Sequence, residues 1–513
     1  MKILQFLSLK ILPLFGFVLA TQALYANEFQ FRGLTYNILT DSTVEVSGID
    51  TTYIGGVSIF ETVTFDSITY DIVAIGNAAF ENAAGVNYVM LPSTVRHIGD
   101  SAFKGCTSLG AIATPDRLNS LGKDAFNGCA SLRSIGLPDT MLLIGEGAFA
   151  GCSLLKSIKI PHGIKQIGDG TFDNCTSLVS VRIPSGVAAV GLNAFRDCSL
   201  LGSINLPDGV VSIGSSAFYN CESLRDIVIP ASTVCIGQDA FEHTLWLDGQ
   251  PDGVVYINNV LYKYKGKMSP NTTLVIKNGI VSLTPRAFYG YDSLVSIVFS
   301  DAITAVSNEC FSGCSSLRSV TLPDALQTIG ASAFFGCVSL DSIAFPSGIQ
   351  SLGSHAFAGC SLLKSAFLPD GVQVIGNEAF MGCSSMRSVY LPSTLTCVPD
   401  SAFLGCTMLT TLRIREGISS LGESAFANCS SLRSVTLPAS LNTIKGNTFS
   451  GCDRLHHVYC LGNTAAYLIG ENHFSESLRA IHISRAALRS YKHHWLAYLD
   501  FLKGEKDMNI VSQ

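Results

Sequence analysis

The sequence is poor in charged residues. Asp, Glu, Lys and Arg together make up 14% of its 513 residues, against about 25% in an average soluble protein. The formal net charge is −6, whereas nucleic-acid-binding proteins are usually basic. The composition therefore argues against nucleic acid as a partner, and it indicates a chain that is largely packed against itself.

Long hydrophobic runs are also missing, except at the N-terminus. There the sequence reads MKILQFLSLKILPLFGFVLATQALYANEF, in which Lys2 and Lys10 precede the apolar run Ile11–Ala20 and small residues follow. This pattern is typical of a secretory signal peptide, which we place at residues 1–26. The alternative, a retained membrane anchor, would need about 20 apolar residues. We therefore expect an exported protein, secreted or at the cell surface, with no transmembrane span after cleavage.

Motifs for catalysis and metal binding are the third absence. The chain contains no G-x-S-x-G, H-E-x-x-H, G-x-x-x-x-G-K-[ST] or C-x-x-C motif. Six of the ten histidines lie near the C-terminus: His456, His457, His473, His482, His493 and His494. They could bind a metal or form an ordinary polar cap, and the lack of a ligand spacing favours the cap. We expect a protein without enzymatic activity, cofactor or metal.

What the sequence does contain is a repeat of 23 residues, marked by phenylalanine. It comprises one run of Phe80, Phe103, Phe126, Phe149, Phe172, Phe195, Phe218 and Phe241, and a second of Phe288, Phe311, Phe334, Phe357, Phe380, Phe403, Phe426 and Phe449. The gap of 47 residues between the runs fits one degenerate unit. Such a period predicts one solenoid instead of several globular domains, because each unit buries its apolar face on its neighbours. About 17 rungs would span on the order of 80 Å.

Each unit predicts a short strand and a buried corner. In SLRSIGLPDTMLLIGEGAFAGC, the side chains of Leu132, Ile135 and Leu137 should point inward from a strand that Pro138 ends. Phenylalanines and cysteines at fixed positions should then stack as a core ladder, which includes Phe103, Cys106, Phe126, Cys129, Phe149, Cys152, Phe334 and Cys337. We interpret these cysteines as buried thiols, with a ladder of disulfides as the alternative. Cys235, Cys310, Cys397 and Cys460 lie outside this frame.

These residues resemble the repeat LxxIxLPxxVxxIGxxAFxGCxS of bacterial BspA-type leucine-rich repeat surface proteins, over roughly residues 70–460. The resemblance implies a leucine-rich-repeat solenoid, α/β-type but mostly β and irregular, with a strand-rich N-terminal cap and a mixed C-terminal cap. It implies adhesion to host matrix proteins and to other cells. After the signal peptide, the divisions we expect are the N-terminal cap 27–69, repeats 70–241, a degenerate repeat with a hairpin 242–287, repeats 288–459 and the C-terminal cap 460–513.

The degenerate unit carries several aromatic residues. Asn258–Asn259 forms a plausible hairpin turn, since Asn tolerates a positive φ angle. The aromatic residues around it are Trp246, Tyr256, Tyr262 and Tyr264. They could form a binding knob or be ordinary strand residues, and we favour the second because strands are normally rich in aromatics.

The second, third and fifth positions of L-x-x-I-x-L should face solvent, and we expect them on the concave face. These positions carry an excess of +8 in a chain of net charge −6, from Arg133, Lys156, Lys159, Arg182, Arg225, Arg318, Lys364, Arg387, Arg413 and Arg433 against Asp226 and Asp341. Near the C-terminus the fifth position becomes aromatic. Our candidate ligand-binding residues are Lys364, Phe367, Arg387, Tyr390, Arg413, Arg433 and Tyr459. Alternatively, the basic residues only protect exposed strands from association.

Two functions are compatible with this sequence. One is an adhesin whose repeat face binds host or microbial proteins. The other is a glycan-capture or envelope-scaffold protein, with sugars stacked on the aromatic rungs. Ionic strength separates them, because a basic face that binds an anionic protein loses affinity as salt screens its charges.

Overall fold

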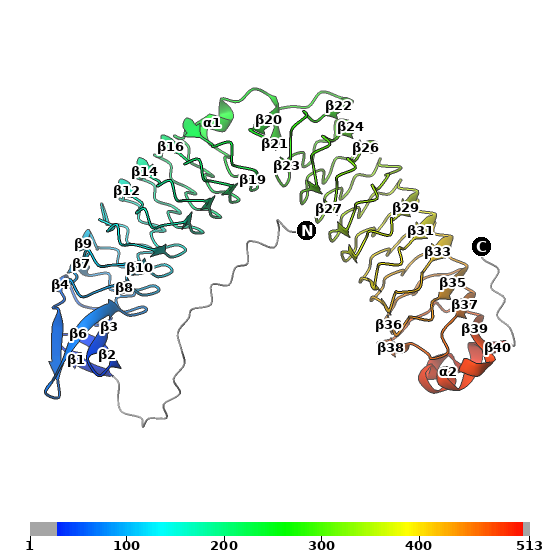
Figure 1. Cartoon of the computed structure of the whole chain (residues 1–513). Helices are drawn as coiled ribbons and strands as arrows, with labels where there is room; N and C mark the ends of the chain where they lie inside the picture. Colours follow the sequence, from blue (N-terminus) through cyan, green and yellow to red (C-terminus); the bar gives the residue numbers. More distant parts are fainter. Residues whose placement is uncertain (1–27, 506–513) are drawn as a thin grey trace.

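The chain folds into one arch-shaped solenoid (Figure 1). This computed structural model describes residues 28–505, so the predicted signal peptide, 1–26, lies outside the described residues. The turns contribute short strands, most of which pair in parallel with strands of the next turn, as Ser157 pairs with Ser180. The predicted solenoid is confirmed, and its 23-residue period is the length of one turn.

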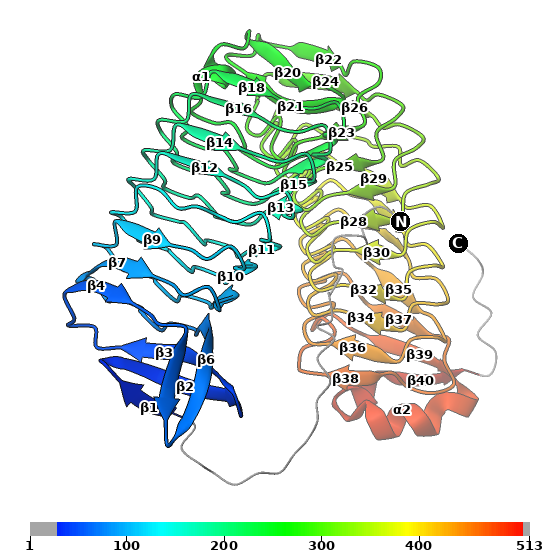
Figure 2. The same ribbon diagram turned by 60° about the vertical axis from the view of Figure 1, so that its left-hand side comes forward.

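The L-x-x-I-x-L segments, together with the cap strands that pair with them at both ends, form the convex, outer side of the arch. We call their strands the outer ladder; they are β4 (Gly55–Ser58), β7 (Val86–Met90), β9 (Ala111–Ala113), β12 (Ser157–Lys159), β14 (Ser180–Arg182), β16 (Ser203–Asn205), β18 (Asp226–Val228), β22 (Thr272–Val275), β24 (Leu294–Val298), β26 (Ser319–Thr321), β29 (Ser365–Phe367), β31 (Ser388–Tyr390), β33 (Thr411–Arg413), β35 (Ser434–Leu437), β37 (His457–Cys460), β39 (Ala480–Ser484) and β40 (Leu502–Glu505). Figures 1 and 2 both place these strands on the outside of the arch. The expectation that they line the concave face is therefore wrong.

The concave side is formed by the second apolar run of each unit, the one that ends in Ile-Gly or its equivalent. These strands are the inner ladder: β8 (His97–Ile98), β10 (Ser120–Leu121), β11 (Leu143–Ile144), β13 (Gln166–Ile167), β15 (Ala189–Val190), β17 (Ser212–Ile213), β19 (Cys235–Ile236), β23 (Ser282–Leu283), β25 (Ala305–Val306), β27 (Thr328–Ile329), β28 (Ser351–Leu352), β30 (Val374–Ile375), β32 (Cys397–Val398), β34 (Ser420–Leu421), β36 (Thr443–Lys445) and β38 (Tyr467–Ile469). From β10 to β34 they contain no charged residue. The two faces of the arch thus differ sharply in charge.

A column of phenylalanine rings fills the space between the two ladders. Phe334 is fully buried, and its ring lies 5.3 Å from that of Phe311 and 5.2 Å from that of Phe357, centroid to centroid. Phe103, Phe126 and Phe149 stack in the same way at 5.2 and 5.6 Å. One further ring continues the column, because Phe474 stacks on Phe449 at 5.7 Å. The 23-residue period misses Phe474, which follows Phe449 by 25 residues.

The cysteines of the ladder are buried, free thiols. Each donates its S–H to the carbonyl of a phenylalanine in the preceding turn, as Cys106 does to Phe80 at 3.0 Å and Cys337 to Phe311 at 3.2 Å. Cys129 and Cys152 repeat this contact. Burial raises the pKa of the Cys106 thiol to about 12. The thiol therefore acts as a small hydrophobic group with one satisfied donor.

Two cysteines differ from the others in being exposed: Cys235 in β19 and Cys397 in β32, both on the concave side. A thiol with a pKa of about 12 is ionised in only about one molecule in ten thousand at pH 8. We therefore expect iodoacetamide to modify two of the 17 cysteines in the native protein, as measured by intact mass. In guanidinium chloride without reductant all should react. Modification of fewer than 17 cysteines in guanidinium chloride would support the ladder of disulfides. Modification of a ladder cysteine in the native protein would contradict its burial.

The degenerate unit interrupts the ladder at the crown of the arch. It contains the short helix α1 (Leu245–Asp248) and a hairpin of β20 (Gly253–Ile257) and β21 (Val260–Lys265), which turns at Asn258 with a φ angle of 51°. Tyr262 is buried, and its hydroxyl accepts a hydrogen bond from the backbone N–H of Phe241 at 2.9 Å. Trp246, Tyr256 and Tyr264 are half-buried against the core. These rings pack inward, which disfavours the binding knob.

Caps close both ends of the solenoid (Figure 2). At the N-terminal end, β1 (Glu28–Phe31), β2 (Leu34–Thr40) and β3 (Thr43–Ile49) pair antiparallel, and β3 pairs in parallel with β6 (Ile68–Ile75), which is flanked by β5 (Thr62–Phe65). The C-terminal cap comprises η1 (Arg485–Ala487), α2 (Leu488–His494) and η2 (Leu496–Phe501). Its anchor is Trp495, which is 1% exposed and donates from Nε1 to the carbonyl of Ala466 at 2.7 Å. None of the helices in residues 28–505 has the length and hydrophobicity that a membrane span requires.

Candidate binding surface

We call the part of the arch that follows the degenerate unit, residues 288–505, the C-terminal arm, and the part before it the N-terminal arm. The outer ladder of the C-terminal arm brings together most of the candidate ligand-binding residues. In the sheet β29-β31-β33, Phe367 is in register with Tyr390, and Tyr390 with Arg413. The rings of Phe367 and Tyr390 stack face to face, with centroids 4.8 Å apart and planes at 17°. Although it is a phenylalanine, Phe367 is 59% exposed. A bulky aromatic pair therefore stands on the convex surface with Arg413 beside it.

A second aromatic pair lies further along the same ladder. Tyr459 in β37 is in register with His482 in β39, and their rings stack at 4.5 Å. His457 Nδ1 lies 3.0 Å from His482 Nε2. From the sequence we expected His482 in a polar cap, and its contacts with His457 and Tyr459 were not predicted. The signal was present, since His482 follows Leu478 at the fifth position of one more L-x-x-I-x-L segment.

The basic candidates differ in how they are paired. Lys364 forms an ion pair with Asp341 at 3.1 Å, so part of its charge is balanced. Arg387, Arg413 and Arg433 are exposed, and within residues 28–505 none of them has a carboxylate partner. Arg433 precedes β35, two turns beyond Arg387, and is separated from the Phe367–Tyr390 pair by the turn that carries Arg413. Three exposed guanidinium groups thus remain available to a ligand.

The surroundings of Tyr459 are basic too. Burial is the main factor that lowers the pKa of His457, and positive charge on His482, His456 and Arg479 lowers it further. The backbone N–H of His456 donates to the carbonyl of Arg433, and that of Arg479 donates to the carbonyl of His456. These basic residues are therefore neighbours in successive turns. We call the surface formed by Lys364, Phe367, Arg387, Tyr390, Arg413, Arg433, Tyr459 and His482 the basic ridge. It combines cations with aromatic rings that are exposed or half-buried, and arginine and aromatic residues dominate binding hot spots.

The concave side offers different chemistry. In the C-terminal arm, three glutamines lie beside one another in successive turns. The backbone N–H of Gln350 donates to the carbonyl of Gln327 at 2.7 Å, and that of Gln373 donates to the carbonyl of Gln350 at 2.8 Å. Their neighbours Thr328 and Ser351 are in register in β27 and β28. From β23 to β34 the strands of this face carry no charged residue. The charge excess that the sequence predicted is thus confined to the opposite, convex side.

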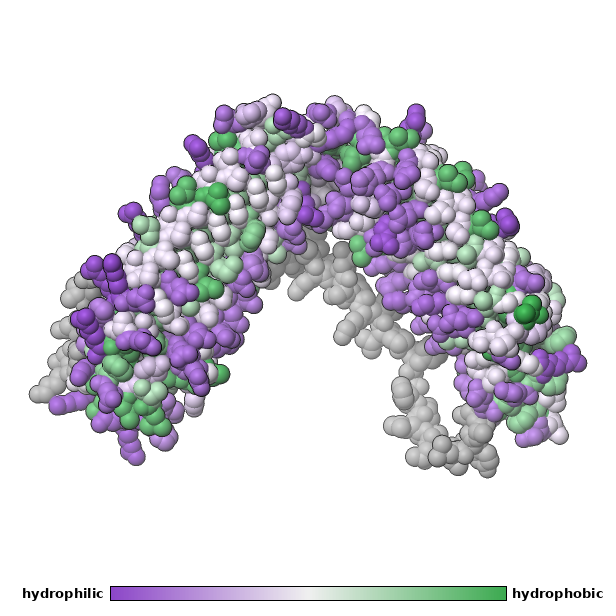
Figure 3. Space-filling model, turned by 180° about the vertical axis from the view of Figure 1, so that it is seen from behind, coloured by the Kyte–Doolittle hydropathy of each residue, from purple (hydrophilic) through white to green (hydrophobic). Residues whose placement is uncertain are grey.

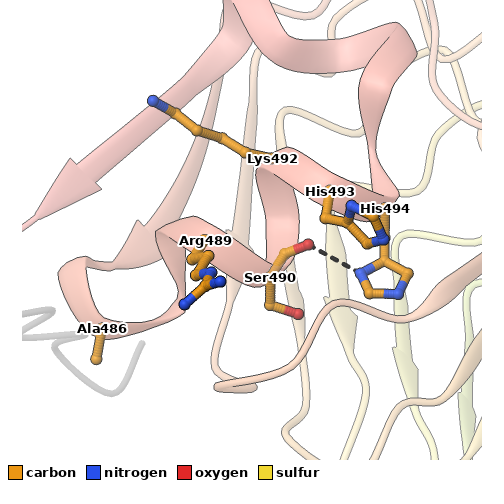
Figure 4. A pocket seen from close by; sticks show the side chains of 6 residues that line it. All are labelled: Ala486, Arg489, Ser490, Lys492, His493 and His494. Atoms are coloured by element: carbon orange, nitrogen blue, oxygen red, sulfur yellow. Dashed lines mark hydrogen bonds between the residues drawn. The ribbon is translucent and has the colours of Figure 1, made fainter.

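The C-terminal cap carries a basic hollow on α2 (Figure 4). It is lined by Ala486, Arg489, Ser490, Lys492, His493 and His494. His494 Nδ1 donates a hydrogen bond to the carbonyl of Ser490 at 2.9 Å. All these residues come from one short stretch of chain, so no second element of the described residues closes the hollow. In the described part of the chain, no three His, Cys, Asp or Glu residues are arranged to hold a metal ion.

Comparison with known proteins gives a consistent result. A model of the BspA type leucine-rich repeat region, in 6 copies, matches residues 73–201, 190–249, 255–383 and 350–480. A leucine-rich repeat protein from Bacteroides ovatus is 31% identical, with 75% of this chain and 100% of that chain covered and a TM-score of 0.46. A leucine-rich cell surface protein from Faecalibacterium prausnitzii is 25% identical, with 86% and 96% covered and a TM-score of 0.38. No curated protein matches the chain.

The family model covers well over half of the 513 residues. It spans the ladder of phenylalanines and cysteines, the interruption and most of the basic ridge. Repeats of this kind build extended binding surfaces instead of single catalytic pockets. The chain belongs to the BspA-type leucine-rich repeat family.

Proposed function

We propose that the protein is an exported, non-catalytic adhesin whose basic ridge binds acidic regions of host or microbial proteins. The observation that carries this proposal is the stacked pair of exposed Phe367 and half-buried Tyr390, next to arginines for which residues 28–505 provide no carboxylate partner. Arginine donates fork-shaped hydrogen bonds to carboxylates, and exposed aromatic rings supply the apolar contact of a hot spot. The signal sequence and the family both support a secreted or surface location.

The stacking of the aromatic rings favours a protein over a sugar. Sugars stack on the flat faces of aromatic rings, but Phe367 and Tyr390 cover one another's inner faces at a centroid distance of 4.8 Å. Tyr459 and His482 do the same at 4.5 Å. Stacking thus covers one face of each ring, whereas the ring edges carry partial positive charge and can attract carboxylates. Glycan capture, or a scaffold role without a specific ligand, remains the alternative function.

Binding of the purified mature chain to arrays of matrix proteins and glycans tests the proposal. We expect protein binding that weakens about tenfold or more between low and high salt, because screening shortens the reach of exposed charges to about 10 Å at 0.1 M. Binding to sugars alone, insensitive to salt, would contradict the proposal and favour glycan capture. A lack of binding to every protein and glycan would favour the scaffold.

A further inference from the structure

A pocket lies at the C-terminal end of the solenoid, between the last turn and the cap. It has a volume of about 530 Å³ and is bounded by residues 470–476 on one side and by η2 on the other. Phe474, the last ring of the phenylalanine column, lines it together with Tyr498, which meets Phe474 edge to face at 5.2 Å. Leu496 and Phe501 add an apolar wall. Hydrophobic residues also gather at this end of the arch in Figure 3.

The polar groups of the pocket are mainly acidic or accepting. Glu471 and Glu476 both line it and are exposed, and no described residue forms an ion pair with either. His473 is 4% exposed and its Nε2 lies 3.1 Å from the carbonyl oxygen of Ile469, so Nε2 carries the proton and donates. Burial lowers the pKa of His473, which keeps the ring neutral and leaves Nδ1 as an acceptor. His494 is the remaining basic group that lines the pocket.

We infer that this pocket binds an arginine side chain of a partner protein. A guanidinium group donates from its fork of N–H groups to carboxylates such as those of Glu471 and Glu476, and it is attracted to a half-buried aromatic ring such as that of Tyr498. The methylene stem of an arginine can lie along the apolar wall of Leu496 and Phe501. The inference goes beyond the proposed function, because the pocket selects a cation whereas the basic ridge selects an anion. The ridge and the pocket would recognise different parts of a ligand.

The test uses N-acetyl-arginine methylamide as the probe and N-acetyl-citrulline methylamide as its neutral, nearly isosteric control. Binding to the full mature chain is followed by saturation-transfer NMR and calorimetry at low salt. We expect the arginine compound to bind about tenfold or more tightly than the citrulline compound, since hydrogen bonds between charged groups are the strong ones. Equal binding of the two compounds, or no binding of the arginine compound, would overturn the inference.

Variants locate the binding and separate it from that of the ridge. The double variant Glu471→Gln/Glu476→Gln keeps size and polarity at exposed positions and should weaken probe binding about tenfold. Glu222→Gln, an exposed glutamate on the N-terminal arm, is the matched control and should change nothing. Arg387→Glu/Arg413→Glu should leave the probe affinity unchanged, even where it abolishes binding of a protein ligand. If the double glutamine variant, folded by circular dichroism, binds the probe as tightly as the parent chain, the inference fails.

Discussion

Replacing Phe334 with alanine should lower the free energy of unfolding by about 3–5 kcal/mol. The ring is fully buried between Phe311 and Phe357, so its removal loses both apolar burial and contacts with two neighbouring turns. A rigid column cannot close the resulting cavity easily, because each turn is fixed by backbone hydrogen bonds such as Phe334 N–H to the carbonyl of Ala356 at 2.8 Å. Urea denaturation followed by circular dichroism measures the loss.

The adjacent residue provides a matched control. Phe335 is 42% exposed and points away from the column, so Phe335→Ala removes the same atoms from the neighbouring position. Its cost should remain below about 1 kcal/mol, as for most surface substitutions. A similar loss for both variants would mean that the column does not carry the stability of the arm.

The second large effect concerns the basic ridge. Arg387→Glu combined with Arg413→Glu should weaken binding to a protein ligand about a hundredfold, because truncation of a hot-spot residue typically costs about 2 kcal/mol and charge reversal adds repulsion. Neither arginine has a described carboxylate partner, so the fold should be unaffected. Surface plasmon resonance against the ligand found on the array, at two salt concentrations, gives the affinity and its salt dependence.

A control for this variant lies on the other arm. Arg133→Glu with Arg182→Glu makes the same change in net charge at two exposed positions of L-x-x-I-x-L segments, but without a stacked aromatic pair beside them. If this control weakens binding as much as the ridge variant does, the ligand responds to overall charge and the ridge is not its site. Phe367→Ala, which removes one ring of the pair, should weaken binding without altering the salt dependence.

The repeat was readable from the sequence because the solenoid repeats its physical constraints. Most turns bury a ring at the place of Phe103 or Phe334 and a small group at the place of Cys106 or Cys337, so the same residues recur every 23 positions. The closing turn was not predicted, because its spacing differs from 23 residues. Its ring, Phe474, meets only one like neighbour and then Trp495, so the loop before it could lengthen to a 25-residue step without breaking the stack.

The side of the arch on which the ridge lies could not be predicted in the same way. The strand of Phe367 and the strand of Val374 both have an inward-pointing apolar residue and exposed neighbours, so the pattern of burial is alike on the two sides. The direction in which the solenoid curves depends on which face has the larger spacing between successive turns. The pattern of apolar and polar residues does not predict which face that is. The pocket was also missed, because Glu471 and Tyr498 come together only when the cap folds back on the last turn.

The hairpin at the crown has a consequence for how the molecule resists damage. The buried core falls into two clusters that meet there, with Val260 in one and its neighbour Leu261 in the other. In a solenoid, cooperativity passes through the contact between adjacent turns, so we expect this interruption of the stack to divide the chain into two folding units. A protease or a shear force that opens the N-terminal unit would leave the other unit folded. The ridge and the pocket both lie in that second unit, so a damaged molecule would keep the surfaces with which it binds.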